Sequence, residues 1–171
     1  MKHTNIKNTK YMVYLAMCLA LELALSYVEA LFPFNMGIPG AKVGLPNIVT
    51  VLLLYTAGPG AALSVGAARV LLGGFMFGNL FAILYSAGGL AVSFAAMLLL
   101  KKTGAFGIAG VSIAGGICHN IGQILIAVCI TNYSVLSYLP FLIAAGTAAG
   151  AVIGVISGIT AKRLGTMLRK L

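Results

Sequence analysis

Residues 43–75 read VGLPNIVTVLLLYTAGPGAALSVGAARVLLGGF, an apolar run whose interpretation decides the number of helices in the chain. A helix that crosses about 30 Å of hydrocarbon needs about 20 residues, so this run is too long for one span. Gly58-Pro59-Gly60 interrupts it with residues that favour a turn. We therefore predict two shorter helices, over about 45–57 and 60–74. Pro46 fits the first turn of the former, where its missing N–H has no intrahelical partner.

The composition of the chain excludes a water-soluble domain. The 171 residues are 61% hydrophobic and only 8% charged, whereas soluble domains carry about 25% charged residues. A surface that cannot be covered with charge must face lipid. We predict one transmembrane domain over residues 1–171.

Basic residues outside the apolar runs set the expected topology. Four further runs are long enough to span a bilayer: about 11–31, 79–100, 107–130 and 136–160. The basic clusters are Lys2, Lys7 and Lys10; Lys101 and Lys102; and Lys162, Arg163, Arg169 and Lys170. Lys and Arg concentrate in cytoplasmic loops, so an even number of crossings must separate these clusters. The prediction is an all-α integral membrane protein with six transmembrane helices and both termini cytoplasmic, its first helix retained rather than cleaved as a signal sequence.

The formal net charge of +9 does not indicate nucleic-acid binding. The basic residues flank spans, where they fit anionic lipid heads, and no basic surface with stacking aromatics accompanies them. The chain has no Asp and lacks HExxH, Walker-type and dinucleotide motifs. Cys18, Cys118 and Cys129 fall in apolar runs without metal-ligand spacing. We expect no enzyme activity on this chain alone, no metal site and no cofactor.

Two ladders of small residues repeat every four positions. One is Ala16, Ala20 and Ala24 in the first helix, and the other is Gly146, Gly150, Gly154 and Gly158 in the last. Such a stripe lets another helix backbone approach closely. The glycine ladder favours packing within the bundle, whereas the alanine ladder could pack internally or dock a partner subunit.

Polar residues gather in the outer half of the expected bundle. The two acidic residues, Glu22 and Glu29, are seven positions apart on one face of the first helix, and intramembrane ionisable groups are functional candidates. The candidate ligand-binding residues are Glu29, Lys42, Asn47, Arg69, His119, Asn120 and Gln123. Arg69 must meet a Glu of the first helix or an anionic ligand. The alternative is that these groups only pair helices with one another.

Six glycines near these polar residues lead to a second expectation, which concerns the wall of a cavity. Their positions are 73, 74, 78, 115, 116 and 122. We expect them to thin the walls of a cavity that opens to the outside, so that a ligand approaches the backbone. His119 and Gln123 share a helix face, and Asn120 is turned about 100° from His119.

Three segments carry a family resemblance: PGAKVGLPNIVTVLLLY (39–55), GAARVLLGGFMFG (66–78) and GVSIAGGICHNIGQ (110–123). They resemble the bacterial membrane family called Gx transporter or heptaprenyl diphosphate synthase component I. That family is similar to the substrate-binding S components of energy-coupling-factor (ECF) transporters. The resemblance implies a six-helix S-component-like bundle in the bacterial plasma membrane. It also implies that Ala16, Ala20 and Ala24 dock a transmembrane T subunit driven by two ATPases.

Two functions follow as hypotheses. The first is a substrate-binding membrane subunit for uptake of a small anionic or polar-headed solute, dependent on a partner motor. The second is a membrane accessory of isoprenoid or quinone metabolism, or of flavin-based extracellular electron transfer. A synthase activity is not supported, because prenyl diphosphate synthases hold magnesium through Asp-rich motifs and this chain has no Asp.

Overall fold

The computed structural model describes residues 6–31, 44–131 and 133–168, and the regular secondary structure in these ranges is all helical. The helices are α1 (Ile6–Leu31), α2 (Asn47–Thr56), α3 (Pro59–Phe77), α4 (Leu80–Thr103), α5 (Ile108–Ile130) and α6 (Leu139–Leu168), with a 3₁₀ helix η1 (Tyr133–Tyr138) before α6. The expected all-α fold with six α-helices is confirmed. The last helix begins later than expected because residues 133–138 form the 3₁₀ turn.

The split of the 43–75 run into two helices is also confirmed. Gly58 adopts φ 96°, a value that L side chains rarely take, and Pro59 opens α3. The two residues therefore make the tight turn that the sequence indicated. Lys101 at the end of α4 donates to the carbonyl of Leu54 and lies over the ring of Tyr55, so it fixes the C-terminal end of α2.

Five described helical segments are long and apolar enough to cross a membrane, and α2 is not one of them. Its ten residues extend only about 15 Å. Seven of those ten residues are buried. α2 is thus an internal half-length helix, packed against α3 and α6.

The closest packing lies between α5 and its neighbours α4 and α6. A Cβ on Gly146 would lie 2.7 Å from the carbonyl oxygen of Gly116, and one on Gly150 would lie 2.7 Å from the Cα of Ile113. Gly154 approaches α5 in the same way, 2.6 Å from the Cα of Ala109. The expectation that the glycine ladder of α6 packs within the bundle is confirmed for these three positions.

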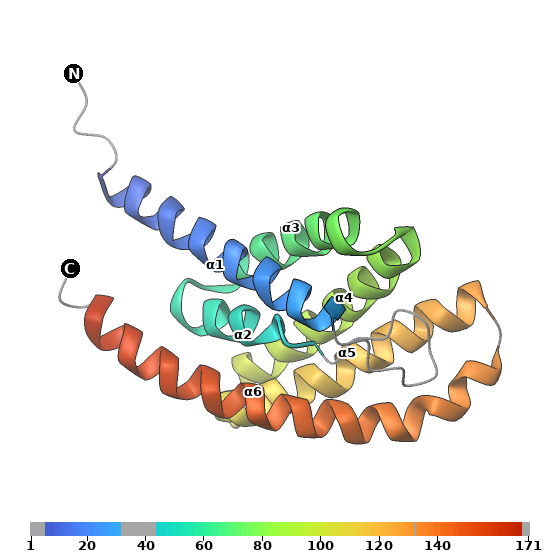
Figure 1. Cartoon of the computed structure of the whole chain (residues 1–171). Coiled ribbons are helices and arrows are strands. Elements are labelled where there is room, and N and C mark those ends of the chain that lie inside the picture. The colour runs from blue at the N-terminus through green and yellow to red at the C-terminus, as the bar shows by residue number, and fades with distance from the viewer. Residues whose placement is uncertain (1–5, 32–43, 132, 169–171) are drawn as a thin grey trace.

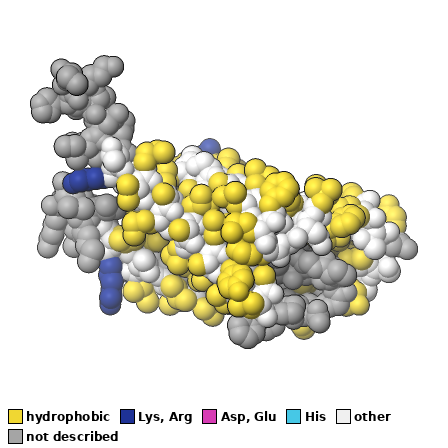
Figure 2. Space-filling view, turned by 45° about the horizontal axis from the view of Figure 1, so that its top comes forward, with side chains coloured by type: hydrophobic (Ala, Val, Ile, Leu, Met, Phe, Trp, Pro, Cys, Tyr) yellow, Lys and Arg dark blue, Asp and Glu magenta, His cyan; other side chains and the backbone are white. Residues whose placement is uncertain are grey.

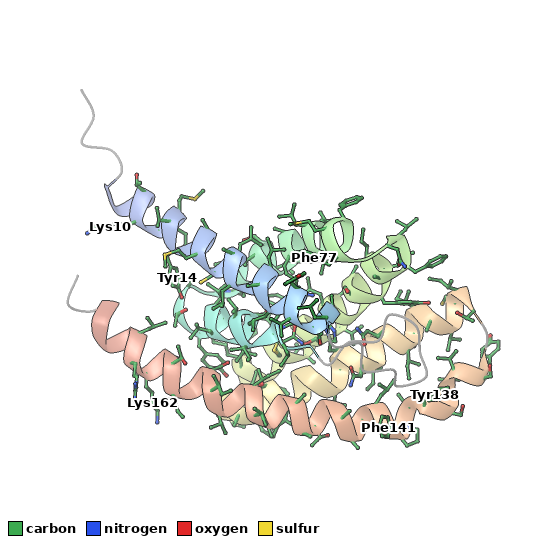
Figure 3. The ribbon with its side chains drawn as sticks, in the orientation of Figure 1. Lys10, Tyr14, Phe77, Tyr138, Phe141 and Lys162 are labelled. Atoms are coloured by element: carbon green, nitrogen blue, oxygen red, sulfur yellow. The ribbon has the colours of Figure 1, made fainter. Side chains whose placement is uncertain are left out.

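Figure 1 shows α1 and α3 on one side of the bundle and the bowed α6 on the other, with α2, α4 and α5 between them. Lys10 and Lys162 stand at the end where both termini lie, and Tyr138 and Phe141 stand at the opposite end (Figure 3). Figure 2 shows basic side chains at the first of these ends and a long face of mainly hydrophobic side chains. The chain has the surface of a multi-pass membrane protein.

One substitution tests the α4–α5 packing. A Cβ on Gly122 would lie 2.4 Å from the carbonyl oxygen of Gly88, which is backbone and cannot move aside. We expect Gly122→Ala to destabilise the protein by about 1–3 kcal/mol through overpacking, measured as a lower melting temperature in detergent. Gly60→Ala is the control, because a Cβ there has no neighbour within 4 Å. Equal stability of the two variants would contradict the packing.

Candidate functional site

The fully buried side chains of α1 are polar or small, whereas its Leu15, Leu19 and Leu25 are half-buried against the apolar core. Among its described side chains, the buried ones are Cys18, Glu22, Ser26 and Glu29, spaced four, four and three residues apart. Its large apolar residues such as Met12, Met17 and Leu21 are exposed. Spacings of three and four residues place the buried set on one stripe.

Three polar contacts join α1 to α2 and the residues before it. They are Tyr14 OH with Thr56 Oγ1 (2.9 Å), Thr50 Oγ1 donating to Glu22 Oε1 (2.8 Å), and the Gly44 N–H donating to Glu29 Oε1 (2.5 Å). The contacts recur at about two-turn intervals along α1, so they fix the antiparallel register of the two helices. Figure 3 shows Tyr14 on the bundle side of α1.

Arg69 of α3 completes this layer. Arg69 is only 5% exposed, and its Nε lies 3.8 Å from Glu22 Oε2. Arg69 also interacts electrostatically with Glu29. Its Nε and Nη2 make no hydrogen bond to any described residue. The expected pairing of Arg69 with a Glu of the first helix is therefore confirmed, but it leaves hydrogen-bonding capacity on the guanidinium.

α5 places His119 in the same region, and Gln123 follows one turn later on the same face of α5. A Cβ on Gly44 would lie 2.8 Å from Asn47 Nδ2 and 3.9 Å from His119 Cδ2, so the residues just before α2 lie near His119 of α5. His119 also packs against Gly89 of α4, where a Cβ would lie 2.7 Å from its ring. Gln123 is 4% exposed, and both atoms of its amide lack a hydrogen-bond partner among the described residues.

Asn120 belongs to a different contact. Its Nδ2 donates to the carbonyl of Leu142 in α6 at 2.6 Å, within the α5–α6 seam. The structure thus separates Asn120 from the face that carries His119 and Gln123, as the 100° rotation indicates. Lys42 lies outside the described residues. We use the name polar layer for the set Glu22, Ser26, Glu29, Gly44, Asn47, Thr50, Arg69, His119 and Gln123.

The expectation that glycines thin the wall of a ligand cavity is wrong at four positions. A Cβ at Gly74, Gly115, Gly116 or Gly122 would lie within 2.7 Å of a neighbouring helix, against Ile83, Met97, Gly146 or Gly88 respectively. These glycines serve close helix packing. Gly73 differs, because its Cβ would meet only Ser26 and Leu23 at ordinary distances of 3.8–3.9 Å.

Thr50, Ser26 and Gly44 were missed as members of the layer. Ser26 follows Glu22 by four residues and Thr50 follows Asn47 by three, which are same-face spacings in a helix. That signal was present in the sequence. Gly44 acts through its backbone N–H and its φ of 89°. The residue type alone does not predict this role.

The alanine ladder lies outside the bundle. Ala16, Ala20 and Ala24 are all exposed on α1, on a different face from Glu22 and Glu29. The structure therefore removes internal packing as the reason for this ladder. Within the described residues, no group of three or more His, Cys, Asp or Glu side chains could hold a metal ion.

A double-variant cycle tests the Glu22–Arg69 pair. We expect Arg69→Gln to lower stability by about 3–5 kcal/mol, because it leaves Glu22 buried without its cation. Glu22→Gln combined with Arg69→Gln should recover most of this loss, since both buried charges are then gone. Melting temperatures in detergent measure both effects. Simple addition of the two single losses would show that the charges do not interact.

Comparison with known families explains the resemblance of the three segments. The sequence model of heptaprenyl diphosphate synthase component I matches residues 16–160, which contain α2 to α5, most of α1 and most of α6. Searches against curated proteins and against solved structures find no match for this chain. The match contains the whole polar layer and the alanine ladder. The chain belongs to the heptaprenyl diphosphate synthase component I family.

Proposed function

We propose that the protein is a substrate-binding membrane subunit, similar to ECF S components, that captures a small polar-headed solute for uptake. It would sit in the bacterial plasma membrane with both termini in the cytoplasm, with five full-length spanning helices and the half-length α2 within the bundle. One observation carries the proposal: Arg69 and Gln123 are buried in the polar layer with hydrogen-bonding atoms that no described residue satisfies.

Unsatisfied buried groups need a compensating reason. Each costs about 1–3 kcal/mol, and more when the group is charged. A charged Arg inside a bilayer costs additional free energy, and membrane proteins retain such residues mainly at functional sites. If the polar layer served only to pair helices, its amide and guanidinium would be expected to end on partners, as Asn120 does on Leu142. A ligand with polar atoms would form the missing hydrogen bonds of both Arg69 and Gln123.

The cations of the site, rather than its formal charge sum, suggest the class of head group that the ligand carries. The described ionisable residues of the polar layer are two carboxylates, Glu22 and Glu29, and one guanidinium, Arg69. With His119 neutral, the formal sum is −1. Arg69 and Lys42 would face an acidic or electron-rich head group of the ligand, while Asn47, His119 and Gln123 would supply hydrogen bonds for specificity.

The exposed alanine ladder supports dependence on a partner. Close approach of a second helix needs small residues, and Ala16, Ala20 and Ala24 offer them on a surface that the bundle itself leaves uncovered. The partner would be a transmembrane T subunit with its ATPases, because the sequence carries no nucleotide-binding motif. On this proposal the chain binds and reorients, and does not catalyse.

The family name favours a second candidate. It describes one component of a heptaprenyl diphosphate synthase, so a membrane accessory of isoprenoid or quinone metabolism, or of an extracellular electron-transfer assembly, is the alternative. Its ligand would place a polar head in the polar layer and a prenyl chain along apolar residues. Leu53, Val65 and Met97 belong to such an apolar core.

Native mass spectrometry of the detergent-purified protein separates the two candidates. A small water-soluble solute that co-purifies supports the uptake subunit, and a prenyl or quinone species supports the accessory. We expect Gln123→Leu to reduce the bound fraction at least tenfold, since about 1.4 kcal/mol corresponds to that factor. Thr147→Ala, an exposed position on α6, is the control. Undiminished ligand in Gln123→Leu would exclude the polar layer as the site.

A single change tests partner docking. Ala20→Leu puts a large side chain in the middle of the exposed ladder, so a T subunit could no longer approach closely. We expect loss of the T subunit and ATPases from pull-downs of native membranes, with the bound ligand unchanged. Val152→Leu alters an exposed position on α6 and should retain the partners. Retention by Ala20→Leu would reject docking at this face.

A further inference from the structure

The two carboxylates of α1 contact the Gly44 N–H and the Arg69 guanidinium, which are the groups best suited to bind an acidic ligand. Glu29 accepts the Gly44 N–H, three residues before the start of α2. Glu22 lies 3.8 Å from the Arg69 guanidinium, and Glu29 interacts with the same cation. A backbone N–H donor just before a helix and a nearby Arg together favour an anion.

The contacts with α1 leave part of the hydrogen-bonding capacity of Arg69 unused. Arg69 is 5% exposed, and its Nε and Nη2 make no hydrogen bond to any described residue. The Glu22–Arg69 separation of 3.8 Å is an ion pair too long for a hydrogen bond. Glu22 Oε2 likewise has no donor among the described residues. The charges are compensated, but the hydrogen bonds are not.

We infer that Glu29 and Glu22 are built-in substitutes for the acidic group of the ligand, a carboxylate or phosphate that replaces them at the Gly44 N–H and Arg69. The inference rests on the proposed binding function and specifies the ligand class of the same site. An acidic ligand is compatible with the formal charge of −1 of the polar layer, because the ligand binds where the α1 carboxylates have moved away and Arg69 remains.

This arrangement connects binding to the position of α1. The buried stripe of α1 is Cys18, Glu22, Ser26 and Glu29, so its polar contacts contribute much of what holds it in the bundle. In lipid, hydrophobic burial adds little to helix association, and packing and polar contacts decide it. A ligand that takes over two of these contacts loosens α1. The exposed alanine face of the same helix then moves with it.

Chemical rescue with acetate tests the inference without knowledge of the natural ligand. Glu29→Ala removes the carboxylate and leaves room for a small one beside Gly44 and Arg69. We expect acetate, compared with chloride at equal ionic strength, to raise the Tm of Glu29→Ala by about 2–4 °C in a saturable way. The wild type should not respond, because Glu29 already fills the position. Glu22→Ala provides a second variant beside the same guanidinium and should respond likewise.

Two controls define the site. Glu29→Ala combined with Arg69→Gln should lose the response, because the cation is gone. Leu53→Ala leaves a cavity in the apolar core, where its side chain packs in one cluster with hydrophobic residues such as Val65 and Met97, and should not respond. If a variant unfolds in chloride, its recovery as a monodisperse species by size exclusion is compared between acetate and chloride, and more is expected in acetate.

The outcomes separate this inference from the proposed function. If neither Glu29→Ala nor Glu22→Ala gains Tm or recovery from acetate, the inference is overturned, even when a ligand co-purifies and Gln123→Leu loses it. A saturable acetate response that depends on Arg69 supports the inference, even when no natural solute is found. A response that persists with Arg69→Gln also overturns it, because acetate would then act elsewhere.

Discussion

The position of α1 depends on polar contacts in surroundings that offer little hydrophobic driving force. In lipid, an apolar helix gains little by leaving the acyl chains for a protein surface. α1 buries Glu22, Ser26 and Glu29, and its Leu15, Leu19 and Leu25 are half-buried against the apolar core. Contacts of the carboxylates with Thr50, Arg69 and Gly44 therefore contribute, with this packing, to where the helix lies. The same contacts make up one side of the polar layer.

The other helices form a frame around this layer. α4, α5 and α6 pack backbone to backbone at glycines, which leaves little freedom between them. α2 is short and buried, with Lys101 at one end and Glu29 at the other. A closely packed frame, an internal half-length helix and a peripheral helix attached partly by polar groups are the features on which the proposed binding function rests. The exposed alanine ladder, the proposed partner contact, lies on this same peripheral helix.

Much of the fold followed from the sequence. The apolar runs, the basic clusters and the Gly58-Pro59 turn predicted the six helices, because length and breakers are local properties. Side-chain roles were less accessible, since they depend on which face meets which helix. Asn120 donates to α6 although it adjoins His119, and Gly122 serves packing rather than a cavity wall. The part of Gly44 depends on its backbone alone.

Determination of the structure with its natural ligand, by electron cryo-microscopy of the protein purified in nanodiscs, is the most direct test of the central claim. The account predicts ligand density in the polar layer, with an acidic group within hydrogen-bond distance of Arg69, a polar edge against Gln123, and Glu29 withdrawn from Gly44. Ligand density elsewhere would contradict the account. So would a ligand-bound structure in which Glu22, Glu29 and Arg69 keep the contacts seen here.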